Sequence, residues 1–297
     1  MNKKHEAISA DPKDEAPKSL ATTTGGTLVA APSYLSEEDF GGGGFEGAGT
    51  EAYALPFLQI LQKMSPLVDE DSPKHVEGAK AGMFYNTVTG ELFDGKEGLT
   101  IIPCAYKRSF IEWGGREGDA GYKGAFTPEQ FDALIQANEV SVLEGRAYRP
   151  DSNGHVNIKK SNYLADTREH YALVQHPKTG TFFAAVIPLA STQTKASRML
   201  MTMLNTYRVD TPNGKRQPPT FAHLVKLTTV PQSNDKGSWS GAKFELTGLI
   251  QDAAIFKDAK DFHQSVTGGE VKADHSKADN SHQETGVSDN ATEAENF

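Results

Sequence analysis

The clearest hydrophobic periodicity in the chain lies between Ser191 and Arg208. Apolar side chains recur there at the i, i+3, i+4, i+7 spacing of one helix face, namely Leu200, Met203, Leu204 and Tyr207. At about 100° per residue the opposite face collects Lys195, Arg198, Thr202 and Asn205. The pattern predicts an amphipathic helix with one face on a core. Its basic face is either an ordinary solvated surface or a contact for an anionic partner.

Two other stretches have helical signals. Between residues 53 and 64 the apolar positions have helical spacing, and Pro66 lies just beyond them; these positions are Phe57, Ile60, Leu61 and Met64. The segment 127–137 begins with a capping box of Thr127 and Gln130, and a proline occupies the first helical position. We therefore expect a core helix over 53–64 and a spacer helix over 127–137.

The remaining apolar runs have the composition and period of β-strands. Residues 83–93 predict a hairpin, and the β-branched run 99–106 predicts a buried strand. Two later pairs of runs should form antiparallel strands, 171–176 with 181–188 and 221–230 with 238–249. The expected fold class is α+β and β-dominated, as an OB-like barrel or a curved antiparallel sheet with a few helices and disordered termini.

Both ends of the chain differ in composition from the middle. Residues 1–50 lack periodicity and contain 4 Lys/Arg against 8 Asp/Glu, and residues 265–297 contain 2 against 7. Residues 51–264 contain 24 of each. We expect a disordered leader over 1–50, a single β-rich nucleic-acid-binding core over 51–264 and a disordered acidic tail over 265–297. Order should fade beyond 252–263.

The sequence gives little support to enzyme chemistry. The single cysteine, Cys104, excludes an intramolecular disulfide and a Cys-based zinc site, and it lies in a run that predicts a buried strand. His170 and His176 share a strand face but lie about 20 Å apart, too far to share a metal. No glycine-rich stretch matches a phosphate-binding motif. We expect no enzyme activity, no catalytic residue, no metal and no cofactor.

Targeting signals are also missing from the sequence. The first residues are polar and charged instead of apolar, and no apolar run approaches the length needed to cross a membrane. The expected location is the cytoplasm, which is the host cell cytoplasm if the protein is encoded by a phage.

Basic residues concentrate between residues 155 and 226, where ten Lys/Arg face three Asp/Glu. Single-stranded nucleic acid is held without sequence readout by a cationic groove and by aromatic rings on which bases stack. Basic and aromatic side chains occur together near two predicted strands, and further basic pairs lie on the amphipathic helix and the loop after it. The candidate nucleic-acid-binding residues are Lys107, Arg108, Phe110, Trp113, Lys159, Lys160, Tyr163, Arg168, Lys195, Arg198, Lys215 and Arg216.

Each basic and aromatic cluster has a second interpretation, in which the rings belong to the core and the cations line its solvated edge. Trp239, flanked by Gly237, Ser238 and Gly241, is either a core anchor or a further stacking ring. The sequence does not decide between these alternatives.

The last thirty residues are acidic, have few large apolar residues and end on Phe297. This tail resembles that of bacterial and phage single-stranded DNA-binding proteins, in which an OB-type core precedes a disordered acidic tail whose final aromatic docks on replication proteins. The resemblance implies that Phe297 binds a polymerase, helicase or primase. The block from Leu55 to Pro66, with the segment 78–82, is also similar to proteins of tailed bacteriophages.

Together these features predict a sequence-independent single-stranded DNA-binding protein that acts in phage DNA replication or recombination. Two alternatives stay open. One is a phage structural or assembly protein whose basic helix contacts another protein, and the other is a single-strand annealing recombinase. The oligomeric state stays open as well, and a homo-oligomer is compatible with each alternative.

Overall fold

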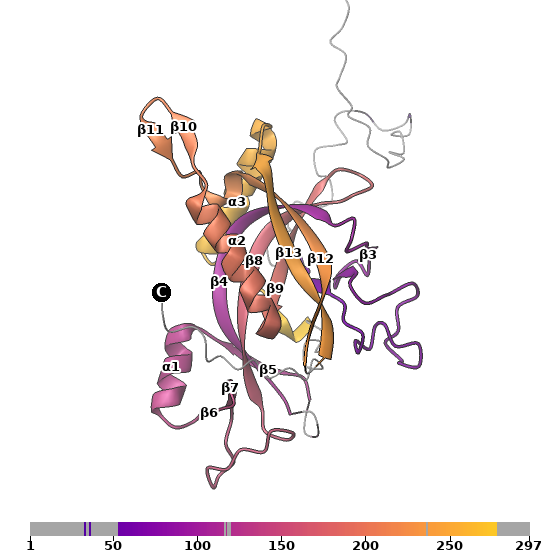
Figure 1. Ribbon diagram of the computed structural model, residues 1–297, viewed down its shortest axis with the longest axis vertical. Coiled ribbons are helices and arrows are strands. Elements are labelled where there is room, and N and C mark those ends of the chain that lie inside the picture. The colour runs from indigo at the N-terminus through magenta and orange to yellow at the C-terminus, as the bar shows by residue number, and fades with distance from the viewer. Residues whose placement is uncertain are drawn as a thin grey trace, which may run out of the picture.

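The structure is a computed structural model that describes residues 53–277, except 116, 118, 119 and 236, together with residues 33 and 36. Within these residues, eight strands form one curved antiparallel sheet (Figure 1). These strands are β4 (Leu99–Trp113), β5 (Tyr122–Phe126), β6 (Ser141–Leu143), β7 (Arg146–Tyr148), β8 (Tyr163–Gln175), β9 (Phe182–Ala190), β12 (His223–Asn234) and β13 (Gly237–Leu249). Their order is β13-β12-β4-β8-β7-β6, with β5 paired to β4 and β9 paired to β8.

Smaller elements surround this sheet. A second sheet contains β1 (Leu58–Ile60), β2 (Phe84–Asn86) and β3 (Leu92–Phe93), and a two-stranded ribbon contains β10 (Val209–Thr211) and β11 (Gly214–Arg216). The helices are α1 (Pro128–Gln136), α2 (Thr194–Thr206) and α3 (Ala253–Thr267). The predicted β-dominated α+β class is confirmed, in its form of a curved sheet and not as a closed barrel.

Strands β4 and β8 are long enough to serve two halves of the sheet. At one end β4 pairs with β12 and β8 pairs with β9, and at the other end β4 pairs with β5 and β8 pairs with β7. Each half has its own apolar cluster. The first half holds the main core, and the second packs α1 on Phe110, Val140, Ala147 and Leu164.

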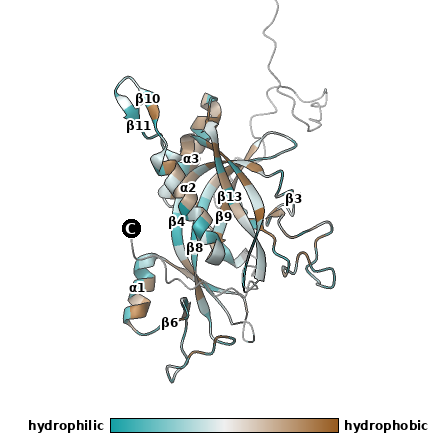
Figure 2. Ribbon diagram, in the orientation of Figure 1, coloured by the Kyte–Doolittle hydropathy of each residue, from teal (hydrophilic) through white to brown (hydrophobic). Residues whose placement is uncertain are grey.

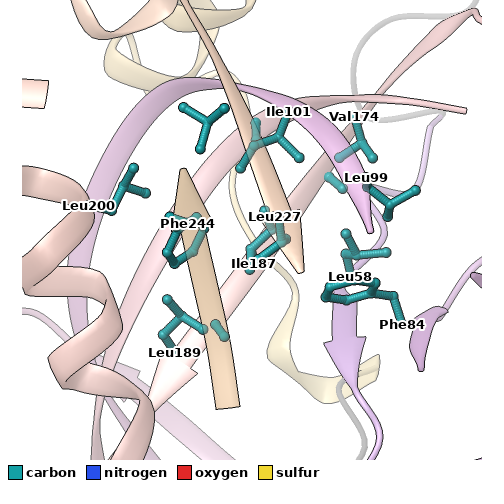
Figure 3. Close-up of a cluster of buried hydrophobic side chains, with 14 of the residues drawn as sticks. Leu58, Phe84, Leu99, Ile101, Val174, Ile187, Leu189, Leu200, Leu227 and Phe244 are labelled. Atoms are coloured by element: carbon teal, nitrogen blue, oxygen red, sulfur yellow. The ribbon is translucent and has the colours of Figure 1, made fainter. Parts of the chain in front are cut away.

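The main core lies on the inner, concave side of the curved sheet. Side chains from β1, β2, β4, β8, β9, β12 and β13 meet there, and α2 adds Leu200 and Leu204 (Figure 3). Successive residues of a strand point to opposite faces, so the other face of the same strands carries a second set of apolar residues. Helix α3 covers that outer face, where Ala259 packs with Ile102 and Cys104.

A β-bulge interrupts the pairing of β4 with β8. Pro103 lies opposite Ala172 and Ala105 lies opposite Tyr171, so Cys104 has no partner across the ladder. The thiol of Cys104 is buried, and burial raises its pKa to about 12. The expected buried position of this cysteine is confirmed.

Two glutamine side chains bond to the free edge of β13. The amide of Gln62 accepts a hydrogen bond from the N–H of Ser240 at 2.9 Å and donates one to its carbonyl at 3.0 Å. The amide of Gln193 donates to the same carbonyl and accepts from the N–H of Ala242, both at 2.8 Å. Both glutamines are buried, so they satisfy backbone groups of the edge strand that would otherwise be buried without partners.

The helix predicted over 53–64 is wrong. Residues 58–60 form strand β1, which pairs with β2, and Phe57 makes a bridge to Val186 of β9. Leu58 and Ile60 enter the main core while Leu61 packs in a separate cluster with Leu67 and Ala79. An extended segment that is buried on both sides has continuous apolar sequence, and a short run of this kind also fits a helical period.

Most other predicted elements agree with the structure, but the loop predicted after the amphipathic helix contains strand β11, which pairs with β10. Helix α1 begins at a capping box in which the Thr127 hydroxyl accepts from the Gln130 N–H and the Gln130 side chain accepts from the Thr127 N–H. The predicted hairpin over 83–93 is the β2-β3 pair, and the two later strand pairs are β8-β9 and β12-β13.

The predicted fading of order beyond 252–263 is wrong within the described residues. Asp252 caps α3, which continues to Thr267, and the chain then lies across the outer face of the sheet as far as residue 277. There His275 Nε2 lies 2.7 Å from Glu169 Oε1, both side chains being buried, and Tyr171 donates to the second oxygen of Glu169 at 3.0 Å. The leader, apart from residues 33 and 36, and residues 278–297 lie outside the described residues.

Helix α2 is fastened to the sheet by a buried polar contact as well as by its leucines. His170 Nε2 of β8 lies 2.8 Å from the hydroxyl of Ser197, and both residues are about 1% exposed. Burial lowers the pKa of His170 from 6.5 to about 4, with the nearby charge of Arg168 as a smaller cause. The imidazole is therefore neutral in the folded protein at neutral pH.

This histidine should make the folded state sensitive to mild acid. Because the unfolded chain binds the proton at a pKa of about 6.5, the contribution of His170 to stability is complete above that pH and is lost as the pH falls toward about 4. From about pH 7.5 to about pH 5, the unfolding free energy should fall by about 2 kcal/mol more in the wild type than in His170→Gln. Urea unfolding measures this difference. His155→Gln, at an exposed histidine, should keep the wild-type dependence, and a His170→Gln protein that also keeps it would contradict the prediction.

Candidate nucleic-acid interface

The solvent face of α2 carries the basic side chains that its sequence periodicity predicts. Lys195, Arg198, Thr202 and Asn205 are all exposed, whereas Ser197, Leu200 and Leu204 are buried against the sheet. In the part of the chain that the structure describes, no acidic side chain forms an ion pair with Lys195 or Arg198. The predicted helix and its two faces are confirmed.

The ribbon formed by β10 and β11 continues directly from the end of α2 and projects away from the sheet (Figure 1). Its residues are exposed or half-exposed, including the predicted site residues Lys215 and Arg216. Lys215 Nζ lies 3.0 Å from Asp210 Oδ1 across the ribbon. Arg208, between the helix and the ribbon, donates to the backbone carbonyls of Asn205 and Tyr207.

Helix and ribbon together form one basic surface, which we call the α2-ribbon surface and define as the exposed residues from Thr194 to Arg216. This segment contains five basic residues and a single acidic residue, Asp210. Figure 2 shows that the ribbon is largely hydrophilic. Because Leu200, Leu204 and Ser197 fix the helix on the sheet, its cations point in one direction.

A second group of predicted site residues lies on the inner face of β4 and β8, where one carboxylate joins two arginines. Asp166 accepts two hydrogen bonds from Arg108, at 2.9 and 2.8 Å, and a third from Arg168 at 2.9 Å. Arg168 also donates to the hydroxyl of Tyr106 at 3.0 Å. The bond to Asp166 raises the pKa of Arg108. Apart from the buried Nε of Arg168, which has no partner, the donors of this cluster bond within it, so the cluster offers less free positive charge than the α2-ribbon surface.

The structure corrects the surface position expected for two aromatic rings. Phe110 is 7% exposed and stacks on Phe131 of α1 with the ring centroids 3.7 Å apart. Trp113 is 9% exposed and contacts the ring of Tyr122 edge to face. Both rings are covered because β5 and α1, the two elements that follow β4 in the chain, fold back over its end.

The other predicted residues are spread over the molecule. Lys107 lies on the outer face, with Nζ 5.1 Å from the centre of the Tyr171 ring. Lys159 and Lys160 are exposed on the loop before β8, where Lys159 forms an ion pair with Glu117 at 3.3 Å. Tyr163, the first residue of β8, is half-buried. The structure therefore does not unite the predicted clusters in one groove.

Trp239, whose role the sequence leaves undecided, is a half-exposed residue near the tip of the β12-β13 hairpin. Its indole N–H donates to the side-chain carbonyl of Gln232, the residue opposite it on β12, at 2.8 Å. Lys63 Nζ lies 3.4 Å from the hydroxyl of the neighbouring Ser238. This tryptophan is therefore a surface residue with a ring partly accessible to solvent.

Two residues of the α2-ribbon surface were not among the predicted site residues. Met199 is 57% exposed in the middle of the basic face of α2. Arg208 is exposed at the junction with the ribbon. A helical projection of the sequence places Met199 one turn after Lys195, on the basic face. The spacing therefore indicated an exposed position, but the apolar side chain suggested a place in the core.

Within residues 53–277, no helix combines the length and the apolar composition needed to span a membrane. Phe297, the predicted partner-binding residue, lies outside the described residues.

The model of the Pam3 phage gp34-like protein family matches residues 23–272 of the chain. The chain belongs to this family. It is therefore a bacteriophage protein, and the matched range includes α2, the ribbon and α3. No curated protein and no solved structure matches the chain.

The two tryptophans of this phage protein should differ sharply in their access to solvent. In Trp239→Phe the remaining Trp113 is packed against Tyr122, so acrylamide should quench its fluorescence weakly. In Trp113→Phe the remaining Trp239 should be quenched several-fold more strongly. Stern–Volmer plots of the two variants give the comparison. Urea-unfolded protein is the control, in which both tryptophans are accessible and should be quenched equally. Equal quenching in the folded state would contradict the burial of Trp113.

Proposed function

We propose that this phage protein binds single-stranded DNA without sequence preference through the α2-ribbon surface. The observation that carries the proposal is the exposure of Lys195 and Arg198, unpaired with any described acidic side chain, on a helix that the sheet holds in place. Arg208, Lys215 and Arg216 extend this positive charge along the ribbon. The protein then acts in phage DNA replication or recombination, in the cytoplasm of the host cell and without catalysis of its own.

Binding through such a surface is mainly electrostatic. Lysine and arginine neutralise phosphates and release the counterions that surround the strand, which makes affinity strongly dependent on salt. Phe110 and Trp113 are packed against other rings, so on the α2-ribbon surface the apolar contact with the strand falls to Met199. A flexible thioether adapts to bases of any identity, which suits binding without sequence readout.

A partner on the replication machinery, bound through Phe297, remains part of the proposal. Residues 278–297 contain five acidic residues and no basic one, so they differ in charge from the α2-ribbon surface. An acidic segment that includes an aromatic residue fits a basic, apolar-centred pocket on another protein.

The exposed apolar residues favour a second candidate function, the assembly of phage structural proteins. Met199 on α2, and Val142 and Leu143 on the edge strand β6, are 57%, 62% and 43% exposed. Apolar side chains on a helix face or a sheet edge are typical of protein–protein contacts. Such contacts depend only weakly on salt, so a salt titration separates this function from nucleic-acid binding.

A strand-annealing assay separates simple coating from annealing by a recombinase.

The salt dependence of binding is the first test of the proposal. If the five basic residues of the α2-ribbon surface each neutralise a phosphate, log K for a labelled single strand should fall with log salt at a slope of about −3.5. Fluorescence anisotropy at several salt concentrations measures this slope. Binding that is absent or independent of salt would refute the proposed function.

Removal of the helix cations is the second test. Lys195→Ala with Arg198→Ala should weaken binding to every sequence and reduce the slope by about 1.4, because two phosphate contacts are lost. The matched control is Lys257→Ala with Lys260→Ala, which removes two exposed cations at the same i, i+3 spacing from α3. That control should bind almost as the wild type does. A similar loss in both double variants would assign the effect to net charge instead of to α2.

A further inference from the structure

The ribbon has a rigid root and a solvated tip. At the root, the ring of Tyr207 meets the buried His223 edge to face with centroids 5.2 Å apart, and His223 Nδ1 donates to the carbonyl of Pro219 at 3.0 Å. Beyond the root, β10 and β11 pair only with each other in the described part of the chain, and none of their side chains is buried. A two-stranded ribbon without a core is marginally stable alone, so its tip gains most from contact with a partner.

The charges on the ribbon are arranged so that only one cation is paired. Asp210 lies directly opposite Lys215 in the strand register and forms an ion pair with it at 3.0 Å. Arg216 lies opposite Val209 and has no acidic neighbour across the ribbon. The side chains of Asp210 and Lys215 are 83% and 72% exposed, so this ion pair is weak and exchanges readily for another anion.

From this arrangement we propose that Asp210 regulates the ribbon part of the α2-ribbon surface by holding Lys215 until a phosphate of the bound strand displaces it. The inference rests on the proposed function and adds a device to it. Phosphate and carboxylate compete for the same ammonium group, so Asp210 lowers the affinity of the ribbon for any single anion. A strand already held by Lys195 and Arg198 presents its phosphates at high local concentration and so wins the competition.

The consequence is that the ribbon favours a continuous strand over isolated anions or short oligonucleotides. A short strand that reaches only α2 gains nothing from Lys215. A longer strand, which extends past Arg208 to the tip, displaces Asp210 and adds the ribbon contacts. Because a strand must displace Asp210 to use Lys215, Asp210 reduces the affinity that the ribbon adds for a long strand.

The test compares Asp210→Asn with Asp258→Asn in binding to labelled oligothymidine. Each variant removes one negative charge from an exposed position, but Asp258 lies on α3, which packs on the face of the sheet opposite to α2. Asp210→Asn should bind up to about fivefold more tightly at low salt, and the gain should shrink as salt screens the pair. Asp258→Asn should change the affinity much less. Urea unfolding verifies that both variants remain folded.

The double variant Asp210→Asn with Lys215→Ala completes the design. Without the ammonium group there is nothing for Asp210 to hold, so in this background Asp210→Asn should have no more effect than Asp258→Asn. Equal gains from the two single Asn variants, or a gain from Asp210→Asn that persists without Lys215, would overturn the inference but leave the proposed function in place. A wild-type protein that binds no oligothymidine would refute both.

Discussion

The hydrogen bonds of two buried glutamine amides to the edge of β13 are the constraint on which the arrangement of this protein depends. Strands β9 and β13 do not pair with each other, and β1 contacts both of them. A buried strand edge without partners would be strongly destabilising. Gln62 and Gln193 supply a donor and an acceptor each, in the positions that a neighbouring strand would occupy. Together with β1, which contacts both β9 and β13, these side chains close this side of the main core.

This seal also determines where the basic surface lies. Gln193 immediately precedes α2, so the same residue that satisfies β13 fixes the first turn of the helix. The bond between Ser197 and His170 and the burial of Leu200 then fix its rotation. A helix anchored at its start and along its length can present lysine and arginine in one direction, which a mobile helix could not do. Substitutions at the seal should therefore disturb the interface without touching a cation.

The sequence was sufficient for the elements whose pattern is local. The two faces of α2 and the capping box of α1 follow from spacing over a few residues, and both are confirmed. The site was less predictable, because the burial of Phe110 and Trp113 depends on how the following segments fold back over β4, which the local pattern does not show. The partner of Arg108, Asp166, is likewise 58 residues away. The prediction for the segment of β1 failed for a different reason, because a short apolar run that is buried on both sides has no period that distinguishes a strand from a helix.

The unpaired Cys104 has an influence that exceeds its size. Before it, the odd-numbered residues of β4, such as Leu99 and Ile101, face the main core; after it, the even-numbered Arg108 and Phe110 occupy the same side. The bulge thus acts as a phase shift within one continuous strand. In a chain that lacked this one residue, every side chain of β4 after the bulge would move to the opposite face of the sheet. The face of the sheet on which the side chains of the α1 half lie is thereby set by a residue that makes no cross-strand pair.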